Sequence, residues 1–369
     1  MKIIYKTEVL LEKLKNIAPT AEAKQTLIIL GNIKFDITDN NSTLIASDLE
    51  IEVSTEVECK AEGSDSFTLP AKKFLEVCSA LSQHESITID INGNKANIIA
   101  GRSKVMLSTL PSDDYPRMTL NNEISKISTS AKNLKLLFEK TAFAMAYQDA
   151  RHFLNGIHIC VRNGKLVSVS TDGHRLSMYS SNIPCEVADL SLILPRKCIQ
   201  ELSRIIASFN DNTEIMAEIT VFSNLINVDV SGYKIISKLI EGNYPDFEKV
   251  IPENTKFILS VEKTTLKNSL NIISKVVNQQ YKGVKFTPSK ESLHLISSNT
   301  DSEIGEDSIP ATYDGEELSI GFNISYVQDV IDSIGGNQVV IKINDQNSGC
   351  VLNDPEAPES VHVIMPMRV

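Results

Sequence analysis

Thr68-Leu-Pro-Ala-Lys-Lys-Phe-Leu-Glu-Val77 is one of three similar stretches that recur along a chain of 369 residues. The other two are Ile193-Leu-Pro-Arg-Lys-Cys-Ile-Gln-Glu-Leu202 and Ile320-Gly-Phe-Asn-Ile-Ser-Tyr-Val-Gln-Asp-Val330. Pro70 and Pro195 are 125 positions apart, and Leu75 and Val327 are 252 apart, about twice that. Because self-similarity at a fixed period indicates a repeated structural unit, we expect three like units.

Each unit is predicted to contain two amphipathic helices. Apolar residues spaced three, four and seven apart indicate a first helix over 10–17, 134–138 and 266–277, and a second over 74–81, 199–206 and 327–334. Between the helices the period falls to two, as in 87–91, 157–161 and 339–343, which indicates strands with one face on a core. In 157–161, Ile157, Ile159 and Val161 alternate with His158 and Cys160. The order predicts an α+β fold, with two helices per unit on one side of antiparallel sheets.

Two Tyr-Pro pairs mark the joins between the units. Ser108-Thr-Leu-Pro-Ser-Asp-Asp-Tyr-Pro116 is echoed by Ser237-Lys-Leu-Ile-Glu-Gly-Asn-Tyr-Pro245, and the final prolines are 129 positions apart. We therefore expect domains over residues 1–124, 125–252 and 253–369.

Composition narrows the class of protein. Hydrophobic residues make up 42% of the chain, no apolar run approaches the ~20 residues of a membrane helix, and no leader pattern follows Met1, so we expect a cytoplasmic protein. The six cysteines are scattered, and neither metal-ligand spacing nor a nucleotide-binding glycine loop is present, so we expect no metal and no cofactor. The net charge of −11 disfavours gripping DNA through phosphate neutralisation.

Thr171-Asp-Gly-His-Arg-Leu176 follows an alternating strand over 166–170. Thr, Asp and Gly form tight turns readily, so a hairpin turn is the simplest interpretation. Asp172 and His174 also permit an acid–base interpretation, in which an enzyme would use both in a turn-based site.

This hexapeptide and the terminal Met365-Pro-Met-Arg-Val369 together resemble the peptide-binding pocket of the beta sliding clamp, the beta subunit of bacterial DNA polymerase III. Further segments match that family in the same order: 26–32 (TLIILGN), 151–156 (RHFLNG), 244–252 (YPDFEKVIP) and 321–326 (GFNISY). The resemblance covers the whole chain. It implies a non-catalytic processivity factor that forms a head-to-tail homodimer, a six-domain ring around double-stranded DNA. A closed ring would hold DNA by encircling it. This does not require a basic protein, so it is compatible with an acidic chain.

The resemblance also implies a pocket for short peptides of the DNA polymerase III catalytic subunit, the clamp loader, other polymerases and repair proteins. Flexible methionines and aliphatic walls suit varied apolar anchors. Lys249 stands where arginine is frequent in the family, and Tyr281 adds a hydroxyl. The matching positions are Leu154, Thr171, Gly173, His174, Arg175, Leu176, Pro245, Lys249, Val250, Tyr281, Asn323, Tyr326, Val363, Met365, Pro366, Met367 and Arg368.

Two further sets complete the expected sites. Cations and one amide would meet DNA phosphates without reading bases; they are Lys24, Lys72, Lys73, Gln148, Arg151, Arg196 and Lys197. A basic group in the first unit would face an acidic group in the third across the dimer interface, because a head-to-tail contact joins different surfaces; this set is Lys73, Phe74, Arg102, Lys104, Asp301, Glu303 and Glu306. A scaffold that binds peptides but never DNA is the remaining alternative.

Overall fold

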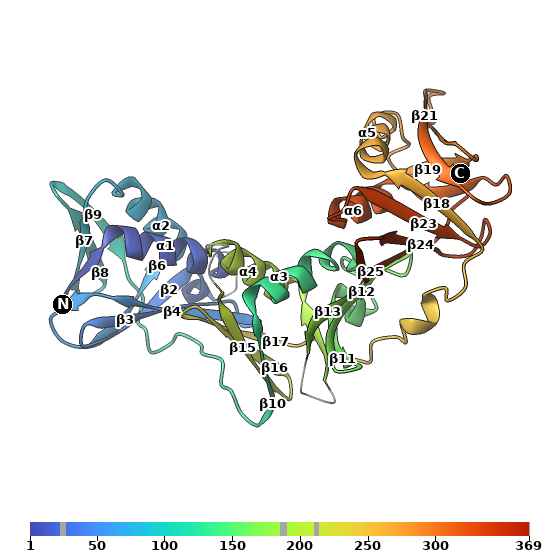
Figure 1. Ribbon diagram of the computed structural model, residues 1–369. Coiled ribbons are helices and arrows are strands. Elements are labelled where there is room, and N and C mark those ends of the chain that lie inside the picture. Colours follow the sequence, from blue (N-terminus) through green and yellow to red (C-terminus); the bar gives the residue numbers. More distant parts are fainter. Residues whose placement is uncertain (23–26, 185–189, 210–213, 369) are drawn as a thin grey trace. The chain divides into compact units, whose positions relative to one another are not determined.

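The three recurring stretches each form a strand that runs directly into a helix (Figure 1). The computed structural model describes residues 1–22, 27–184, 190–209 and 214–368. The pairs are β6 (Asp65–Pro70) with α2 (Ala71–Ala80), β14 (Ser191–Pro195) with α4 (Arg196–Ala207), and β22 (Ile320–Asn323) with α6 (Ile324–Ser333). Pro70 and Pro195 end strands at sheet edges, where a missing N–H costs little. The repeat expected from the sequence is confirmed.

The predicted first helices are also present, each directly after a strand. They are α1 (Thr7–Ile17), α3 (Ala131–Glu139) and α5 (Lys263–Ile273). The third is shorter than the expected 266–277, because the chain leaves the helix at Ser274, whose hydroxyl bonds the carbonyl of Asn271 (2.8 Å). Val277 nevertheless remains buried.

The folded chain divides into two compact units, called unit 1 and unit 2, which differ from the three sequence repeats and are described separately. Unit 1 comprises Met1–Lys135 and Lys197–Leu239, and unit 2 comprises Leu136–Arg196 and Ile240–Val369. The described strands of unit 1 form two antiparallel sheets. One has the order β5 (Lys60–Ala61), β1 (Lys2–Lys6), β7 (Ser86–Asn92), β8 (Lys95–Ala100), β9 (Ser103–Ser108). The other has the order β10 (Glu123–Ser130), β15 (Met216–Phe222), β16 (Leu225–Val230), β17 (Tyr233–Lys238), β4 (Ile51–Glu58), β3 (Asn41–Ser47), β2 (Asn32–Thr38), β6.

The described strands of unit 2 form one long antiparallel sheet. Its order is β14, β11 (Gly156–Arg162), β12 (Lys165–Thr171), β13 (Arg175–Pro184), β25 (Ala357–Ile364), β24 (Cys350–Asp354), β23 (Gln338–Ile343), β18 (Phe257–Glu262), β21 (Ile304–Tyr313), β20 (Ser292–Ser298), β19 (Gly283–Pro288), β22. Strand pairing therefore continues from one sequence repeat into the next: β17 pairs with β4 in unit 1, and β13 pairs with β25 in unit 2. For this reason the compact units divide the middle repeat between them.

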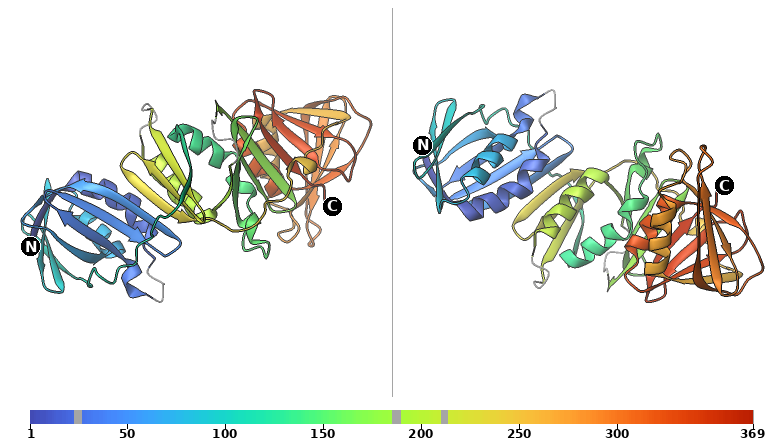
Figure 2. Two further views of the ribbon diagram at one scale, coloured as in Figure 1. Left: turned by 90° about the horizontal axis from the view of Figure 1, so that it is seen from below. Right: turned by 90° about the horizontal axis from the view of Figure 1, so that it is seen from above.

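Within each unit, helices cover one face of the strands. In unit 1, α1 and α2 lie side by side, and in unit 2 the same holds for α5 and α6 (Figure 2). The fully buried Phe74 of α2 meets the Phe35 ring edge-on at 5.6 Å. In unit 2, Phe286 and Phe322 make a similar contact at 5.1 Å. Burying each such side chain stabilises the fold by about 1.5–3 kcal/mol.

One strand prediction is wrong in an instructive way. The alternation predicts one buried face for β11, yet His158 and Cys160 on the opposite face are buried too. The segment 244–251, which includes the 3-10 helix η5 (Glu248–Val250), covers that face: Tyr244 stacks on the His158 ring at 4.7 Å, and Phe247 joins the Cys160 cluster. This part of the sheet is covered on both faces.

Other expectations concern absences. No helix in the described part of the chain is long and apolar enough to cross a membrane. The same residues include no group of three or more His, Cys, Asp or Glu side chains that could hold a metal ion. Among the described residues five cysteines are buried free thiols, and Cys185 lies outside the described residues.

Candidate functional site: a peptide pocket in unit 2

The turn between β12 and β13 is the hairpin turn that the sequence predicts. The Thr171 hydroxyl donates to the Arg175 carbonyl (2.6 Å) and accepts from the Gly173 N–H (3.1 Å). One carboxylate oxygen of Asp172 accepts from the N–H groups of His174 (2.9 Å) and Arg175 (3.1 Å). Gly173 has φ +91°, a value that disfavours residues with a side chain. Local side chains thus fix the backbone of the turn.

The end of the chain runs beside this turn. In the β13–β25 pair, Leu176 is opposite Val363. Beyond the strand, the Met365 N–H donates to the His174 carbonyl (2.9 Å), and the Met367 N–H donates to the Gly321 carbonyl (2.9 Å). The terminal residues thereby connect the turn with β22. Met365 remains 39% exposed, so part of this residue is open to a ligand.

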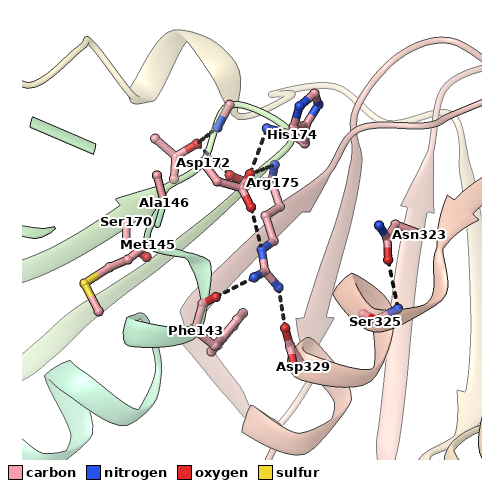
Figure 3. A network of polar contacts seen from close by, with 12 residues as sticks. Phe143, Met145, Ala146, Ser170, Asp172, His174, Arg175, Asn323, Ser325 and Asp329 are labelled. Atoms are coloured by element: carbon pink, nitrogen blue, oxygen red, sulfur yellow. Dashed lines mark hydrogen bonds and ion pairs between the residues drawn. The ribbon is translucent and has the colours of Figure 1, made fainter. Parts of the chain in front are cut away.

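Arg175 lies beneath the turn and contacts three segments of unit 2 (Figure 3). Its Nε donates to Asp172 (3.1 Å), one terminal nitrogen donates to Asp329 of α6 (2.5 Å), and the other donates to the Phe143 carbonyl (2.5 Å). The guanidinium also lies 4.3 Å from the centre of the Tyr326 ring. Only 10% of the Arg175 side chain is exposed.

The remaining predicted pocket residues occupy nearby elements. Leu154 is buried in the 3-10 helix η4 (His152–Asn155), and its N–H donates to the Arg151 carbonyl (2.9 Å). Asn323 caps α6 by accepting from the Ser325 N–H (3.0 Å), and it pairs with Gly283, two residues after Tyr281. Tyr281 is 60% exposed.

Pro245, Lys249 and Val250 belong to the segment that covers β11. Its anchors Tyr244 and Phe247 pack on the apolar cluster that contains Leu176 and Val363. Val250 is 48% exposed, and the Lys249 ammonium forms an ion pair with Asp246 at 3.0 Å. Val250 is therefore an exposed apolar residue on a segment whose anchors pack on a buried apolar cluster.

Burial sets the electrostatics of this region. It raises the pKa of Tyr326, and the neighbouring Asp172 carboxylate adds to this effect. Burial, followed by the positive charge of Arg162, lowers the pKa of His158 to about 4. Both groups are therefore neutral near pH 7.

Asp172 and His174 are not arranged as an acid–base pair. The Asp172 carboxylate bonds two backbone N–H groups and Arg175, while the His174 ring points away from it (Figure 3). A general base must reach the proton that it abstracts. Asp172 instead acts as a turn-forming residue.

Some residues predicted to contact DNA are exposed, whereas others bind groups of the protein. Lys72 and Lys73 are exposed in the first turn of α2, and Gln148 is exposed with φ +54°. Arg151 instead binds Asp149 through two nitrogens (3.0 and 2.9 Å), which lowers the pKa of Asp149 to about 2. Lys24 lies outside the described residues.

Two of the residues predicted to contact DNA, Lys197 and Arg196, interact with other groups of the chain. The Lys197 ammonium contacts the carboxylates of Asp48 and Glu22, the latter at 3.3 Å. Arg196 donates to the carbonyls of Met145 (3.2 Å) and Ala146 (3.0 Å). Both cations therefore already have partners within the chain.

The residues predicted at the dimer interface differ in exposure and in position. Phe74 is fully buried in the core of unit 1, so its ring is not available at a surface. Arg102 and Lys104 are exposed at the edge strand β9. Asp301, Glu303 and Glu306 are exposed at the β20–β21 hairpin, where the amide of Asn299 donates to Glu303 (2.6 Å).

A hollow of about 460 Å³ lies on the same side of β12 and β13 as the covering segment, and sequence reasoning missed it. Val167 and Met178 line it from the strands, and Phe247 and Ile251 line it from the segment. It includes none of the predicted pocket residues. Asp329 and Phe143 were also missed, although Asp329 follows Tyr326 by one helical turn, a spacing that places both on one helix face.

Comparisons with known proteins agree with the geometry over the whole length. Three family models match in succession: the N-terminal domain of the DNA polymerase III beta subunit over residues 1–119, its central domain over 128–246 and its C-terminal domain over 248–368. The beta sliding clamp of Haemophilus influenzae is 33% identical, with full coverage of both chains. This chain belongs to the beta sliding clamp family. The Escherichia coli beta sliding clamp is 31% identical, again with full coverage of both chains.

Solved sliding clamps have the same fold. The DNA polymerase III beta subunit of Pseudomonas aeruginosa superposes with a TM-score of 0.94 at 32% identity, and each chain is fully covered. A second structure of that clamp, with the same score, identity and coverage, is bound to griselimycin. The Caulobacter crescentus beta subunit gives 0.92 at 28% identity, with full coverage. The α+β fold of three clamp domains and the function of a DNA polymerase III processivity clamp follow.

Proposed function

We propose that this sliding clamp is a non-catalytic homodimeric ring that encircles double-stranded DNA in the cytoplasm and tethers partner proteins through one peptide pocket per chain. The observation that carries the proposal is the joining of three distant segments around one apolar surface: Met365 bonds His174, and Met367 bonds Gly321. The partners are the polymerase III catalytic subunit, the clamp loader, and other polymerases and repair proteins with clamp-binding peptides.

The chemistry of the site suits peptides with apolar anchors. Met365 and Val250 are exposed apolar residues, and Leu176 and Val363 belong to the buried apolar cluster on which the covering segment packs. Pockets of this kind bind apolar groups, while a few polar groups fix their orientation. The relative bound to griselimycin makes that compound a suitable probe of this chain.

Two free strand edges support a head-to-tail dimer. Strand β9 ends its sheet, and residues 304–309 of β21 pair only with β20 among the described strands. Met106 and Ile304 are 57% and 63% exposed on these edges. Unpaired edges offer backbone groups to another chain, and the Arg102–Lys104 side is basic whereas the Asp301–Glu306 side is acidic.

We propose domain limits of 1–124, 125–252 and 253–369, which the family matches approximate. Binding by topology lets a chain of net charge −11 remain on DNA. Lys72, Lys73 and Gln148 would make weak phosphate contacts, since their side chains are exposed.

The decisive experiment loads the protein onto nicked circular DNA with a compatible clamp loader and ATP, then linearises the circle. A ring stays on circles and is lost once ends appear. Equal retention before and after cutting would show side-on binding, and absence of retention on circles would favour a scaffold that binds peptides alone.

The same assay tests the interface through Arg102→Glu, with Lys60→Glu on the opposite edge of the same sheet as the matched control. We expect R102E to weaken the dimer and shorten retention, because it places like charges together. K60E should behave like the wild type. If R102E dimerises with unchanged affinity, these charges do not contribute to the interface.

A further inference from the structure

Arg175 is among the residues that the resemblance places in the peptide pocket, but all three of its guanidinium nitrogens already donate to groups of unit 2. An arginine has five N–H donors in a rigid fork. In this structure Nε and both terminal nitrogens donate to Asp172, Asp329 and the Phe143 carbonyl, and the plane lies over Tyr326. With 10% of the side chain exposed, the charge faces the interior of unit 2.

The contacts of Arg175 form one continuous path from α6 to the terminal segment. Asp329 accepts from Arg175, Arg175 donates to Asp172, and Asp172 accepts from the backbone of residues 174 and 175. The His174 carbonyl then accepts from the Met365 N–H. After Asp329, each contact in this path is made by a residue of the 171–176 turn or by Met365, which is expected to meet the ligand.

Asp329 is suited to control this path. It stands one helical turn after Tyr326, so the carboxylate and the ring approach the guanidinium from the same helix face. Its side chain is 42% exposed, more than the 16% of Asp172. Asp329 therefore contributes a negative charge from helix α6 to Arg175, which is otherwise held by Asp172, the Phe143 carbonyl and the Tyr326 ring.

We propose that Asp329 is a positioning residue of the peptide pocket: it holds Arg175 under the 171–176 turn and so fixes the backbone that a partner peptide meets. This rests on the proposed peptide-binding function of the same site. Arg175 acts as an internal brace, and peptide recognition falls to the methionines, the apolar surface and the backbone of the turn. A pre-formed turn removes an ordering cost from binding.

Asp329→Asn tests the proposal, because it keeps the shape of the side chain and removes its charge. Asp332→Asn is the matched control: Asp332 lies on the same helix, is 58% exposed and pairs with Lys267 at 2.6 Å, away from the turn. Griselimycin binding, measured by calorimetry, should be about tenfold weaker in D329N and within about twofold of the wild type in D332N. Asp329→Glu keeps the carboxylate and should recover most of the affinity.

Hydrogen exchange provides a readout that does not depend on the ligand. In D329N the amides of His174, Arg175 and Met365 should exchange about tenfold faster, while β11 amides keep their protection. Binding and exchange equal to those of D332N would overturn the proposal, as would a D329E variant no better than D329N. If the wild type fails to bind griselimycin, the pocket assignment fails, and the exchange measurement still decides whether Asp329 holds the turn.

Discussion

Arg175 and Arg151 approach the same turn, yet they do different work. Arg175 is 10% exposed and bonds residues up to 154 positions away. Arg151 is 53% exposed, binds Asp149 two positions away, and reaches the turn only through the Asp172 carbonyl at 3.4 Å. Both are arginine–aspartate pairs at similar distances, but only one joins separate segments.

The difference shows that the surroundings of an ion pair, rather than its length, determine its structural role. An exposed pair gains little, because water competes for both charges. A buried pair often adds little net stability, yet removing one partner leaves a charge without compensation. The contrast predicts a graded series of effects, largest at Arg175.

Arg175→Ala should have the largest effect. It leaves the Asp172 and Asp329 carboxylates without their shared partner, at a cost of about 3 kcal/mol, the low end for a broken buried pair because Asp329 is partly exposed. Urea unfolding measures the loss. Arg175→Lys should recover only part of it, since an ammonium cannot reproduce the fork; full recovery would show that charge alone matters.

Acid should destabilise the buried side of the turn next. His362 lies 5.8 Å from the Phe143 ring, and burial, then Lys140, lowers its pKa to about 3. The unfolded chain takes up a proton below about pH 6.5 that the folded chain refuses, so stability is complete above that pH and falls as pH drops toward 3. Each such histidine costs up to about 1.4 kcal/mol per pH unit.

His362→Asn checks this by urea unfolding at pH 7 and pH 5. The variant should lose about 2 kcal/mol less than the wild type between these pH values, because His158 still titrates but His362 does not. The Asp149–Arg151 pair contributes almost nothing in this interval, since the Asp149 pKa lies below pH 5 both in the unfolded chain, at about 3.9, and in the folded chain, at about 2. An identical loss in both proteins would contradict the buried neutral ring.

Arg151→Gln should have the smallest effect on stability, with no resolvable change in the unfolding midpoint. The Asp149 pKa should rise only part of the way from about 2 toward its ordinary value, because the side-chain hydrogen bond from Arg151 is its largest cause, whereas the next, from the backbone N–H of residue 151, remains in the variant. Carboxyl NMR titration follows this shift. A large stability loss would mean that Arg151 braces the turn as Arg175 does.

Features set by neighbours in sequence could be predicted. The 171–176 hairpin and the strand–helix repeats depend on turn residues and apolar spacing, and both are present. The double burial of β11 could not be predicted, because it depends on residues 244–251, which lie about 90 positions away.

The sites divide in the same manner. The terminal methionines lie beside the turn as the resemblance implies. Sequence gave no sign that Lys197 would meet Asp48, or that Arg175 would meet Asp329, since these contacts join residues 149 and 154 positions apart. Side-chain type indicated a cation, whereas the fold determined its partner.

The strand pairing across repeats has a consequence for synthesis of the protein. In unit 1, β4 pairs with β17, whose residues 233–238 are synthesised about 180 residues after it. In unit 2, β13 meets β25, which ends at Ile364, so its sheet closes only after nearly all of the chain is made. Pairings this distant slow folding. Until they form, β4 and β13 each keep an open edge, which makes the growing chain a natural client for chaperones.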